Sequence, residues 1–454
     1  MQCFKRLRRG ILLSQTGVVT SACRALRCAR ITLAALPARS SSAPSTSWPS
    51  PHTTNRCCSK PLTPFCYNRN VMPATTMDRV NVVIIGGGVV GCAIARELSK
   101  HISDVFLLEQ LPKLGMATST RNSGVIHSGI YYPPGSLKAR LCVDGNLLTK
   151  EFCSGHGVPY NICGKLVVAS HEAEIGKLER LAENGRKNGV EGLRMVGRER
   201  IREREPHVVA LAALEVPSTG IVAAEELVKA YARVATEQGA SVLTDARVVS
   251  LEPSSDAVIV GVEVGDPADA GSLRRETVEA RCIINAAGLY ADEVAAQMGS
   301  TNYRIYPMRG EYAEITGAKA SLVNALVYPL PHTDGSSLGV HLTRTLWGTV
   351  LVGPTARYVS EKNDYERDRQ PVEDFLRDAL TLLPELELAD LRLAYSGLRP
   401  KLVPPGSHGM ADFIIARDTK CPCAIHLVGI ESPGLTAAPA IAQHVALLVR
   451  ETLS

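Results

Sequence analysis

The sequence predicts an α/β fold that combines a parallel sheet with a second unit of alternating strands. A continuous run of mostly β-branched residues, 80–85, leads into a glycine-rich turn and a helical segment. A second apolar run, 104–110, follows that helix, and alternating strands broken by Gly, Pro and Asp occupy 303–316 and 326–354. Continuous apolar strands are typical of parallel sheets buried on both faces, whereas alternation is typical of hairpins with one buried face.

The charge of the chain is divided between an N-terminal leader and the rest. Residues 1–77 contain eleven Lys and Arg and no Asp or Glu, and the first acidic residue is Asp78. Beyond the leader, 39 of the 50 basic residues remain against 45 acidic ones, a net charge of about −6. The basic balance therefore belongs to the leader, and the sequence does not predict a nucleic-acid-binding protein.

The leader has the composition of a targeting segment. It is rich in Arg, Ser, Thr, Ala and Pro, and residues 4–13 and 23–40 can form short basic amphipathic helices. These features predict a disordered mitochondrial transit leader over 1–77 and a mitochondrial protein. A disordered tail, or an upstream extension before a start at Met77, is the alternative. No apolar run reaches the roughly 18 to 20 residues of a membrane span, so no transmembrane segment is expected.

The cysteines predict neither disulfides nor a metal site. Six of the thirteen lie in the leader and seven are scattered through the body of the chain. An odd, scattered set without a secretory signal favours reduced thiols. Cys421 and Cys423 are separated by one proline, which is not the spacing of a zinc knuckle or a redox pair.

The glycine-rich turn is a dinucleotide-binding pattern. Gly86, Gly88 and Gly91 have the G-x-G-x-x-G spacing, which allows a tight turn, a close approach of the backbone to a diphosphate, and close packing of helix on strand. The diphosphate then lies at the start of the helix, and Glu109 ends the second apolar run, where an acid reaches ribose hydroxyls. A glycine-rich turn beside a solvated Glu109 is the alternative, and the pattern does not choose between NAD and FAD. The residues expected to contact the dinucleotide here are Gly86, Gly88, Val89, Val90, Gly91, Glu109 and Gln110.

A longer segment, "GMATSTRNSGVIHSGIYYPPGSLKARLCVDGN" at 115–146, favours FAD by resemblance. It is similar to the flavin-wrapping segment after the second strand in the D-amino-acid oxidase-like, or glutathione-reductase-like, FAD oxidoreductases. Within them the chain resembles the L-2-hydroxyglutarate dehydrogenase family over about residues 79–450. The later segments that carry the resemblance are 284–295, 307–312, 332–343, 352–358, 396–401 and 428–442.

The resemblance implies FAD as cofactor and an FAD-binding, Rossmann-like domain of the glutathione-reductase type. Because FAD motifs occur on both sides of the alternating strands, a mixed-sheet α+β substrate domain is expected to be inserted into it. The expected cofactor segments are 78–165, 220–305 and 390–454, with the substrate domain at 166–219 and 306–389.

Further FAD contacts are expected at short polar residues and at strand ends. Small hydroxyl and amide side chains can donate hydrogen bonds without bulk. In the family, the helix that begins near residue 434 directs its positive end toward the flavin ring. An ordinary polar loop and a capped surface helix are the respective alternatives. The expected residues are Thr118, Ser119, Asn122, Ser123, Gly124, Val248, Ala286, Ala287, Gly288, Gly429, Ser432, Pro433, Gly434, Leu435 and Thr436.

Histidines are the candidates for the base that removes a hydroxyl proton. His127 lies in the flavin-wrapping segment, and the resemblance places His341 over the isoalloxazine, with His332 at the start of the same hairpin. Histidine titrates near neutral pH and suits this chemistry, although a structural role is the alternative for each.

Cationic side chains are the candidates for binding an acidic substrate. Arg399 and Lys401 lie near the last FAD motif, Arg309 is a weaker candidate, and Tyr131 can add a phenolic hydrogen bond. Guanidinium groups bind carboxylates bidentately, whereas a surface ion pair is the alternative role.

Together these residues predict an FAD-dependent 2-hydroxyacid dehydrogenase or oxidase. The resemblance implies oxidation of L-2-hydroxyglutarate to 2-oxoglutarate by hydride transfer to flavin N5, with a quinone or oxygen as electron acceptor. The fold alone does not choose the substrate. Another flavoenzyme of the group, such as a glycerol-3-phosphate dehydrogenase or amino-acid oxidase, a non-catalytic flavoprotein assembly factor, and an NAD enzyme are the alternatives.

Overall fold

The computed structural model describes residues 78–266, 268–269, 271–331 and 339–454. Residues 77–454 form one compact unit. Among the described residues, no helix is both long enough and apolar enough to cross a membrane. His332 and the leader lie outside the described residues.

An eight-stranded mixed sheet is built around the strand that precedes the glycine turn. β1 pairs in parallel with β2 and β12, β2 pairs in parallel with β9, and β12 pairs in parallel with β20. The β10–β11 hairpin and β19 add antiparallel pairs, both on the side of β12 that faces away from β1. The strands are β1 (Arg79–Ile85), β2 (Val105–Leu108), β9 (Ser241–Leu243), β10 (Ala246–Pro253), β11 (Val258–Val264), β12 (Arg274–Asn285), β19 (Ile414–Arg417) and β20 (Ala424–Val428).

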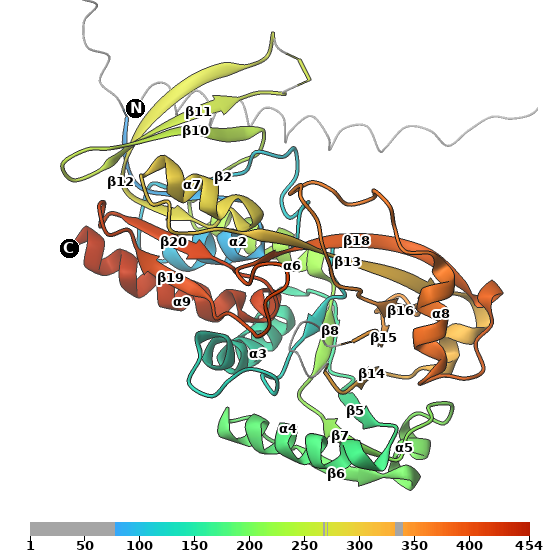
Figure 1. Cartoon of the computed structure of the whole chain (residues 1–454). Helices are drawn as coiled ribbons and strands as arrows, with labels where there is room; N and C mark the ends of the chain where they lie inside the picture. Colours follow the sequence, from blue (N-terminus) through green and yellow to red (C-terminus); the bar gives the residue numbers. More distant parts are fainter. Residues whose placement is uncertain (1–77, 267, 270, 332–338) are drawn as a thin grey trace, which may run out of the picture. The chain divides into compact units, whose positions relative to one another are not determined.

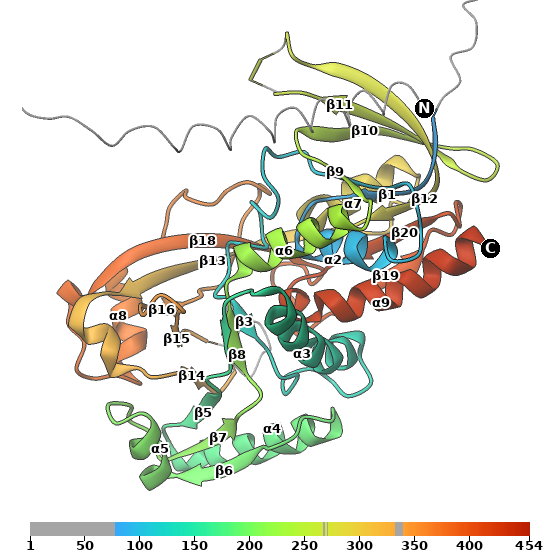
Figure 2. The ribbon, with the colours of Figure 1, turned by 180° about the vertical axis from the view of Figure 1, so that it is seen from behind.

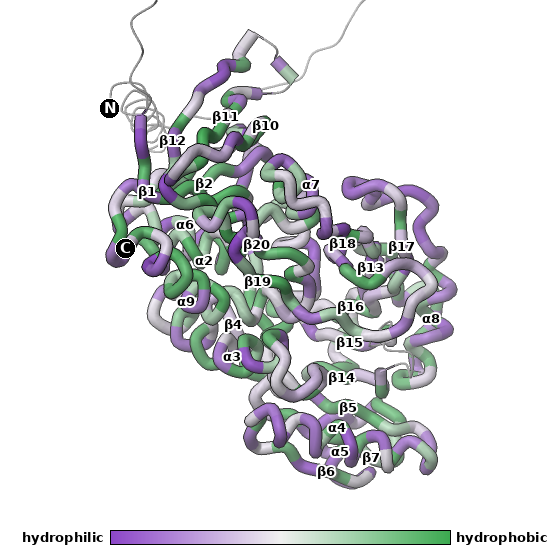
Figure 3. Tube along the Cα trace, turned by 60° about the vertical axis from the view of Figure 1, so that its left-hand side comes forward, coloured by the Kyte–Doolittle hydropathy of each residue, from purple (hydrophilic) through white to green (hydrophobic). Residues whose placement is uncertain are grey.

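Helices cover this sheet on both sides. α2 (Val89–Leu98) packs against α6 (Ala224–Glu237) and α9 (Gly434–Leu453), and α9 also packs against α3 (Leu137–His156). Figures 1 and 2 show α7 (Ala291–Gln297) on the opposite side, near β10 and β12. The hydropathy tube in Figure 3 is green along β2 and α2, where apolar side chains form the core between sheet and helices.

A nine-stranded mixed sheet forms the second large layer. Its order is β17-β13-β16-β15-β14-β5-β7-β6, with β18 paired to β13, and only β14 and β5 are parallel. α4 (Ile175–Lys187), α5 (Arg198–Arg204) and α8 (Val372–Leu380) pack on it. The strands are β5 (Lys165–Ala169), β6 (Arg194–Gly197), β7 (Ala212–Val216), β13 (Tyr306–Ile315), β14 (Leu326–Pro329), β15 (His341–Arg344), β16 (Val350–Gly353), β17 (Arg357–Tyr358) and β18 (Leu391–Lys401).

A small three-stranded sheet joins segments far apart in the sequence. β8 (Gly220–Val222) pairs with both β3 (Val125–Ile126) and β4 (Tyr160–Asn161). Figure 2 shows β3 and β8 side by side next to α3.

The predicted α/β fold with mixed sheets is confirmed, but one strand differs from the expected segmentation. β18 lies within the expected cofactor segment 390–454, yet it pairs with β13 from Tyr306↔Lys401 to Ile315↔Leu391 in the nine-stranded sheet. The motifs next to β18 in the sequence predicted that it belongs to the cofactor segment. Its strand partner, β13, is distant in sequence, and no local pattern indicates that pairing.

Candidate active site

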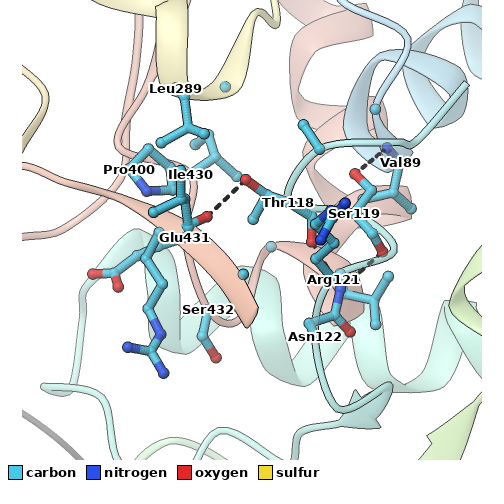
Figure 4. Close-up of a pocket in the computed structure, with 18 of the residues that line it drawn as sticks. Val89, Thr118, Ser119, Arg121, Asn122, Leu289, Pro400, Ile430, Glu431 and Ser432 are labelled. Carbon is cyan, nitrogen blue, oxygen red and sulfur yellow. Dashed lines mark hydrogen bonds between the residues drawn. The ribbon is translucent and has the colours of Figure 1, made fainter. Parts of the chain in front are cut away.

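A cavity of about 590 Å³ lies where residues of the two large sheets meet. Its lining includes Ile85 of β1, Tyr312 of β13 and Leu398 of β18. Figure 4 shows the polar run 118–122 on one side of the cavity, facing Pro400 and residues 430–432 on the other. A cavity of this size, with a mostly apolar lining and convergent polar groups, is typical of cofactor and ligand sites.

The glycine turn forms one end of the cavity. Gly86 has a φ of +111°, and a Cβ atom built there would lie 2.5 Å from the Ala286 carbonyl oxygen. A Cβ atom at Gly91 would lie 2.0 Å from the Gly86 carbonyl oxygen, so α2 can pack on β1 only with glycine at this position. Gly88 faces the cavity, where its Cβ atom would lie 3.0 Å from Ser119 Oγ.

Two helix N-termini open onto the same cavity. Gly88, Val89 and Val90 begin α2, and Pro433 and Gly434 begin α9; all five line the cavity. Ser119 Oγ accepts a hydrogen bond from the Val89 amide at 2.9 Å, drawn as a dashed line in Figure 4. Helix N-termini carry partial positive charge and unpaired amides, so the cavity favours an anionic ligand beside each of them.

Glu109 lies beside the glycine turn, where the sequence predicts a ribose contact. Its carboxylate accepts hydrogen bonds from the Gly87 amide at 2.7 Å and from the Leu111 amide at 2.9 Å. Burial raises the pKa of Glu109, and these amide contacts oppose that rise. The carboxylate is therefore held rigidly at the cavity wall, and its contact with a ribose stays a prediction.

Several side chains of the polar run 118–124 form hydrogen bonds with other parts of the protein. Thr118 Oγ1 donates to the Leu398 carbonyl at 2.8 Å. Asn122 Nδ2 donates to the Thr118 and Ser119 carbonyls, and Asn122 Oδ1 accepts from the Gly124 amide. These contacts shape the loop, and donation from its side chains to a cofactor stays a prediction.

The two candidate histidines are both neutral and both line the cavity. Burial, and then the charge of Lys165, lower the pKa of His127 to about 3. His127 Nε2 lies 3.2 Å from Ser432 Oγ, and its buried Nδ1 has no hydrogen-bond partner among the described residues. This nitrogen is buried, so a ligand reaches it only if the ring or its surroundings move.

His341 is held in one tautomer. Its Nδ1 lies 2.9 Å from the Gly339 carbonyl oxygen, which can only accept, so Nδ1 carries the proton and Nε2 keeps its lone pair. The ring stacks on Tyr328 with centroids 3.7 Å apart. Burial, with smaller contributions from the charges of Lys165 and Arg399, lowers the pKa of His341 to about 3, and the Gly339 contact opposes this shift.

Arg399 is a cation in the cavity without a carboxylate partner in the described part of the chain. Within the described residues, its guanidinium donates a hydrogen bond to a neutral acceptor, the Thr355 carbonyl oxygen, at 3.3 Å. Gly310 faces it across the β13–β18 pair, and a Cβ atom there would lie 2.8 Å from Arg399 Nη2. This glycine leaves the space that the guanidinium occupies.

Lys401 also lines the cavity, but its charge is partly compensated. Its Nζ lies 3.1 Å from Glu431 Oε1, and Lys138 Nζ lies 2.9 Å from the same oxygen. Burial alone would raise the pKa of Glu431, but the two ammonium groups hold it below its ordinary value. The three side chains are a buried cluster of net charge +1, so Lys401 is not the independent carboxylate clamp that the sequence predicts.

Arg309 has a structural role instead of the predicted substrate contact. Its fully buried guanidinium pairs with Glu311 and with Asp364, each at 2.9 Å, and it does not line the cavity. Arg309 therefore forms an ion pair, as in the alternative, but the pair is buried and not on the surface.

Most of the predicted site residues converge on this one cavity. Five of the catalytic and substrate-binding candidates line it: His127, Tyr131, His341, Arg399 and Lys401. The predicted cofactor residues that line it are Gly86, Gly88, Val89, Val90, Glu109, Gln110, Thr118, Ser119, Asn122, Ser123, Val248, Ala286, Ala287, Gly288, Ser432, Pro433, Gly434 and Leu435.

Four predicted cofactor residues support the walls from behind. Gly91 packs on Gly86, and Gly124, with a φ of +66°, lies against the Val222 carbonyl oxygen. Gly429, with a φ of +73°, lies against the Leu402 side chain. Thr436 Oγ1 accepts from the His127 amide and donates to the Val125 carbonyl. None of the four lines the cavity, because these small residues are needed for chain packing rather than for ligand contact.

Several residues in or next to the site were missed by the sequence analysis. Arg121 lines the cavity with its guanidinium 4.4 Å from the Tyr365 ring centroid, and Lys138 and Glu431 form the cluster with Lys401. Lys165 is fully buried next to the cavity residue Tyr131. Each is a single polar residue in a mixed or apolar stretch, and no spacing signal marks it.

Comparison with known proteins identifies the class of protein first. A family model described as FAD dependent oxidoreductase matches residues 81–448. The chain belongs to this family, so it is an FAD oxidoreductase, and the predicted cofactor is confirmed.

The relatives narrow the class. A curated protein from Arabidopsis thaliana, named L-2-hydroxyglutarate dehydrogenase, mitochondrial, is 35% identical over 81% of this chain and 83% of its own. One from Nematostella vectensis with the same name is 38% identical over 76% of this chain and 74% of its own. The L-2-hydroxyglutarate dehydrogenase of Escherichia coli K12 is 32% identical over 82% of this chain and 93% of its own. The resemblance to the L-2-hydroxyglutarate dehydrogenase family is confirmed.

A solved structure supports the fold and the cofactor. The L-α-glycerophosphate oxidase of Mycoplasma pneumoniae with FAD bound superposes with a TM-score of 0.73 at 29% identity, over 82% of this chain and 95% of that one. Glycine oxidase from Geobacillus kaustophilus, at 21% identity and a TM-score of 0.68, shows the shared fold.

The residues present fit FAD. The glycine turn leaves open the volume that a Cβ atom at Gly88 would enter, two helix N-termini face the cavity, and the cavity extends from Val248 to His341. A diphosphate suits the amides at the start of α2, and a flavin suits the apolar and aromatic middle.

Gly88→Val should abolish FAD retention, because a branched side chain would fill the space beside Ser119 where a diphosphate approaches the backbone. The measurement is the flavin-to-protein absorbance ratio of purified protein after desalting. Gly155→Ala is the matched control, because a Cβ atom there meets nothing within 4 Å, and that variant should stay yellow. Stoichiometric FAD in Gly88→Val would show that the diphosphate lies elsewhere.

Proposed function

We propose that this protein oxidises L-2-hydroxyglutarate to 2-oxoglutarate with FAD as the hydride acceptor. The observation that carries the proposal is the unpaired Arg399 guanidinium in one cavity with two neutral histidines. The names of the relatives point to the same substrate. A 2-hydroxy dicarboxylate needs a cation for binding and a base for its hydroxyl group, and the cavity lining offers both.

The chain supplies the base as a neutral imidazole. FAD, when bound, accepts the hydride from the carbon that carries the hydroxyl group. The hydroxyl proton passes to His341 Nε2, which keeps its lone pair, or to the His127 imidazole. Both imidazoles have a pKa of about 3, so they are unprotonated at physiological pH, and an anionic substrate beside them would raise that pKa toward the range of an effective base.

Arg399 binds one substrate carboxylate. Its guanidinium faces a cavity position that contains no competing carboxylate among the described residues, and Gly310 keeps the space around it open. A bidentate guanidinium–carboxylate contact in a desolvated site fixes orientation as well as affinity. This orientation explains selectivity for one enantiomer, since only one can present its C–H bond and its hydroxyl group in the required directions.

In this proposal the two large sheets have different roles. The segments of the eight-stranded sheet hold FAD, and the nine-stranded sheet, including β18, covers the substrate. The leader 1–77 directs the protein to mitochondria, in line with the names of the eukaryotic relatives, while a quinone or oxygen reoxidises the flavin.

A reporter fused to residues 1–77 tests the targeting part. The fusion should enter mitochondria, and replacing its eleven basic residues with Gln should leave it in the cytosol, because import depends on positive charge. Fluorescence microscopy with a mitochondrial marker is the readout. Cytosolic residence of the unaltered fusion would remove this claim.

Anaerobic flavin reduction tests the substrate. L-2-hydroxyglutarate should bleach the flavin absorbance rapidly, and the D enantiomer, glycerol 3-phosphate and neutral D-amino acids should act far more slowly. Faster bleaching by glycerol 3-phosphate would favour a glycerophosphate oxidase activity, the one in the name of the Mycoplasma pneumoniae protein. No bleaching by any hydroxy acid or amine would favour a non-catalytic flavoprotein.

In the same assay Arg399→Met should lower kcat/KM by roughly 30-fold or more, because loss of one partner of a desolvated charge pair costs about 2–5 kcal/mol. Arg392→Met, at an exposed position of the same strand, is the matched control and should leave the rate unchanged. Arg399→Met with wild-type kcat/KM and retained flavin would contradict this role.

A further inference from the structure

Lys165, at the start of β5, is a fully buried cation. No carboxylate in the described part of the chain forms an ion pair with it. Its Nζ lies 3.3 Å from Tyr131 Oη and sits 4.5 Å and 4.6 Å from the ring centroids of Tyr131 and Tyr328. The ammonium is therefore enclosed by a hydroxyl group and two aromatic faces, which stabilise a cation only in part.

An ammonium in this position is costly for the folded protein. Burial lowers the pKa of Lys165 to about 7, from an ordinary value of 10.5. An apolar side chain of similar length would fill the same space without that cost. A positive charge held here without a counterion is therefore suited to a ligand that brings the negative charge with it.

The enclosing residues connect Lys165 to the active-site cavity. Tyr131, Tyr328, His127 and His341 all line that cavity. An ammonium can only donate, so Tyr131 Oη accepts from Lys165 and keeps its own proton for another acceptor. Lys165 and Arg399 both act electrostatically on His341, so this imidazole is close enough to both cations to feel their charge.

We propose that Lys165 is a positioning residue for the second carboxylate of a dianionic substrate, acting through the Tyr131 hydroxyl group, which donates a hydrogen bond to that carboxylate. The inference rests on the proposed function. Arg399 then binds one carboxylate and the Lys165–Tyr131 pair binds the other, with the hydroxyl-bearing carbon near the histidines.

The proposal predicts a pH dependence of substrate binding. A dianion nearby favours the ammonium, so the pKa of Lys165 is higher in the complex than in the free protein. Below about pH 7 the amine already carries its charge, and binding is tightest. Above that pH a proton must be taken up on binding, so affinity falls by up to about tenfold per pH unit until the pKa of the complex is reached.

The other titratable groups around Lys165 do not change charge in this range. His127 and His341 have a pKa of about 3. Burial raises the pKa of Tyr131, of Tyr328 and of Cys142 on α3 far above neutrality. The strands paired with β5 place the apolar residues Leu326 and Val216 opposite Lys165.

The experiment compares holoenzyme variants in anaerobic stopped-flow reduction by L-2-hydroxyglutarate from pH 6 to pH 9, with the substrate Kd and the limiting reduction rate fitted separately. In Lys165→Met the Kd at pH 6.5 should rise at least tenfold and lose its pH dependence, while the limiting rate changes by less than about threefold. Lys165→Arg, which stays charged, should bind more tightly than Lys165→Met and show no weakening up to pH 9.

Lys177→Met is the matched control, because Lys177 is an exposed lysine that shares a surface pocket with Tyr131. It should keep the wild-type Kd and pH profile. Tyr131→Phe, which keeps the ring and removes the hydroxyl group, tests the same contact if Lys165→Met does not hold flavin, and it should raise the Kd and flatten the profile.

Wild-type Kd and pH dependence in Lys165→Met, or an unchanged Kd in Tyr131→Phe, would overturn the inference while leaving the proposed function intact. A fall in the limiting rate without a change in Kd would also overturn it. Failure of the wild-type flavin to be reduced by L-2-hydroxyglutarate at any pH would overturn the proposed function and the inference with it.

Discussion

The two large sheets are joined by a backbone contact between residues 118–122 and strand β18. A Cβ atom at Gly397 would lie 1.9 Å from the Arg121 carbonyl oxygen, so only glycine allows this approach. Thr118 Oγ1 and Tyr395 Oη fasten the contact through hydrogen bonds of 2.8 Å to the Leu398 and Asn122 carbonyls. Because β18 pairs along most of its length with β13, this contact fixes the nine-stranded sheet against the loop that follows β2. It also brings Arg399, two residues further on, into the cavity with His127.

The electrostatics of the cavity follow from this arrangement. Strands β5, β15 and β18 contribute Lys165, His341 and Arg399, and burial keeps the imidazole neutral while the guanidinium stays charged. The Lys138–Glu431–Lys401 cluster adds a further positive charge near the start of α9. Cations without counterions lower the stability of a folded chain, and a ligand with two carboxylates would compensate them. The same residues thus explain both why the cavity favours an anionic ligand and why its bases are unprotonated.

Local patterns predicted the parts of this protein that depend on local geometry. Strand 80–85, the glycine turn and the helix from residue 434 were correctly placed, because glycine spacing and apolar runs reflect constraints within a few residues. The same glycine signal also marks Gly124 and Gly429, which pack against the chain outside the cavity lining, since it marks close packing without saying whether chain or ligand approaches. The sheet to which β18 belongs, and the buried positions of Lys165 and Lys138, arise from contacts between segments more than seventy residues apart. No period or motif in the sequence encodes them.

A crystal structure of the FAD-loaded protein with 2-oxoglutarate bound would test the proposed substrate position most directly. It should show one carboxylate on the Arg399 guanidinium, the other within hydrogen-bond distance of Tyr131 Oη, and the keto oxygen next to His341 or His127. A ligand whose carboxylates avoid Arg399 and whose keto oxygen lies away from both histidines would contradict the account.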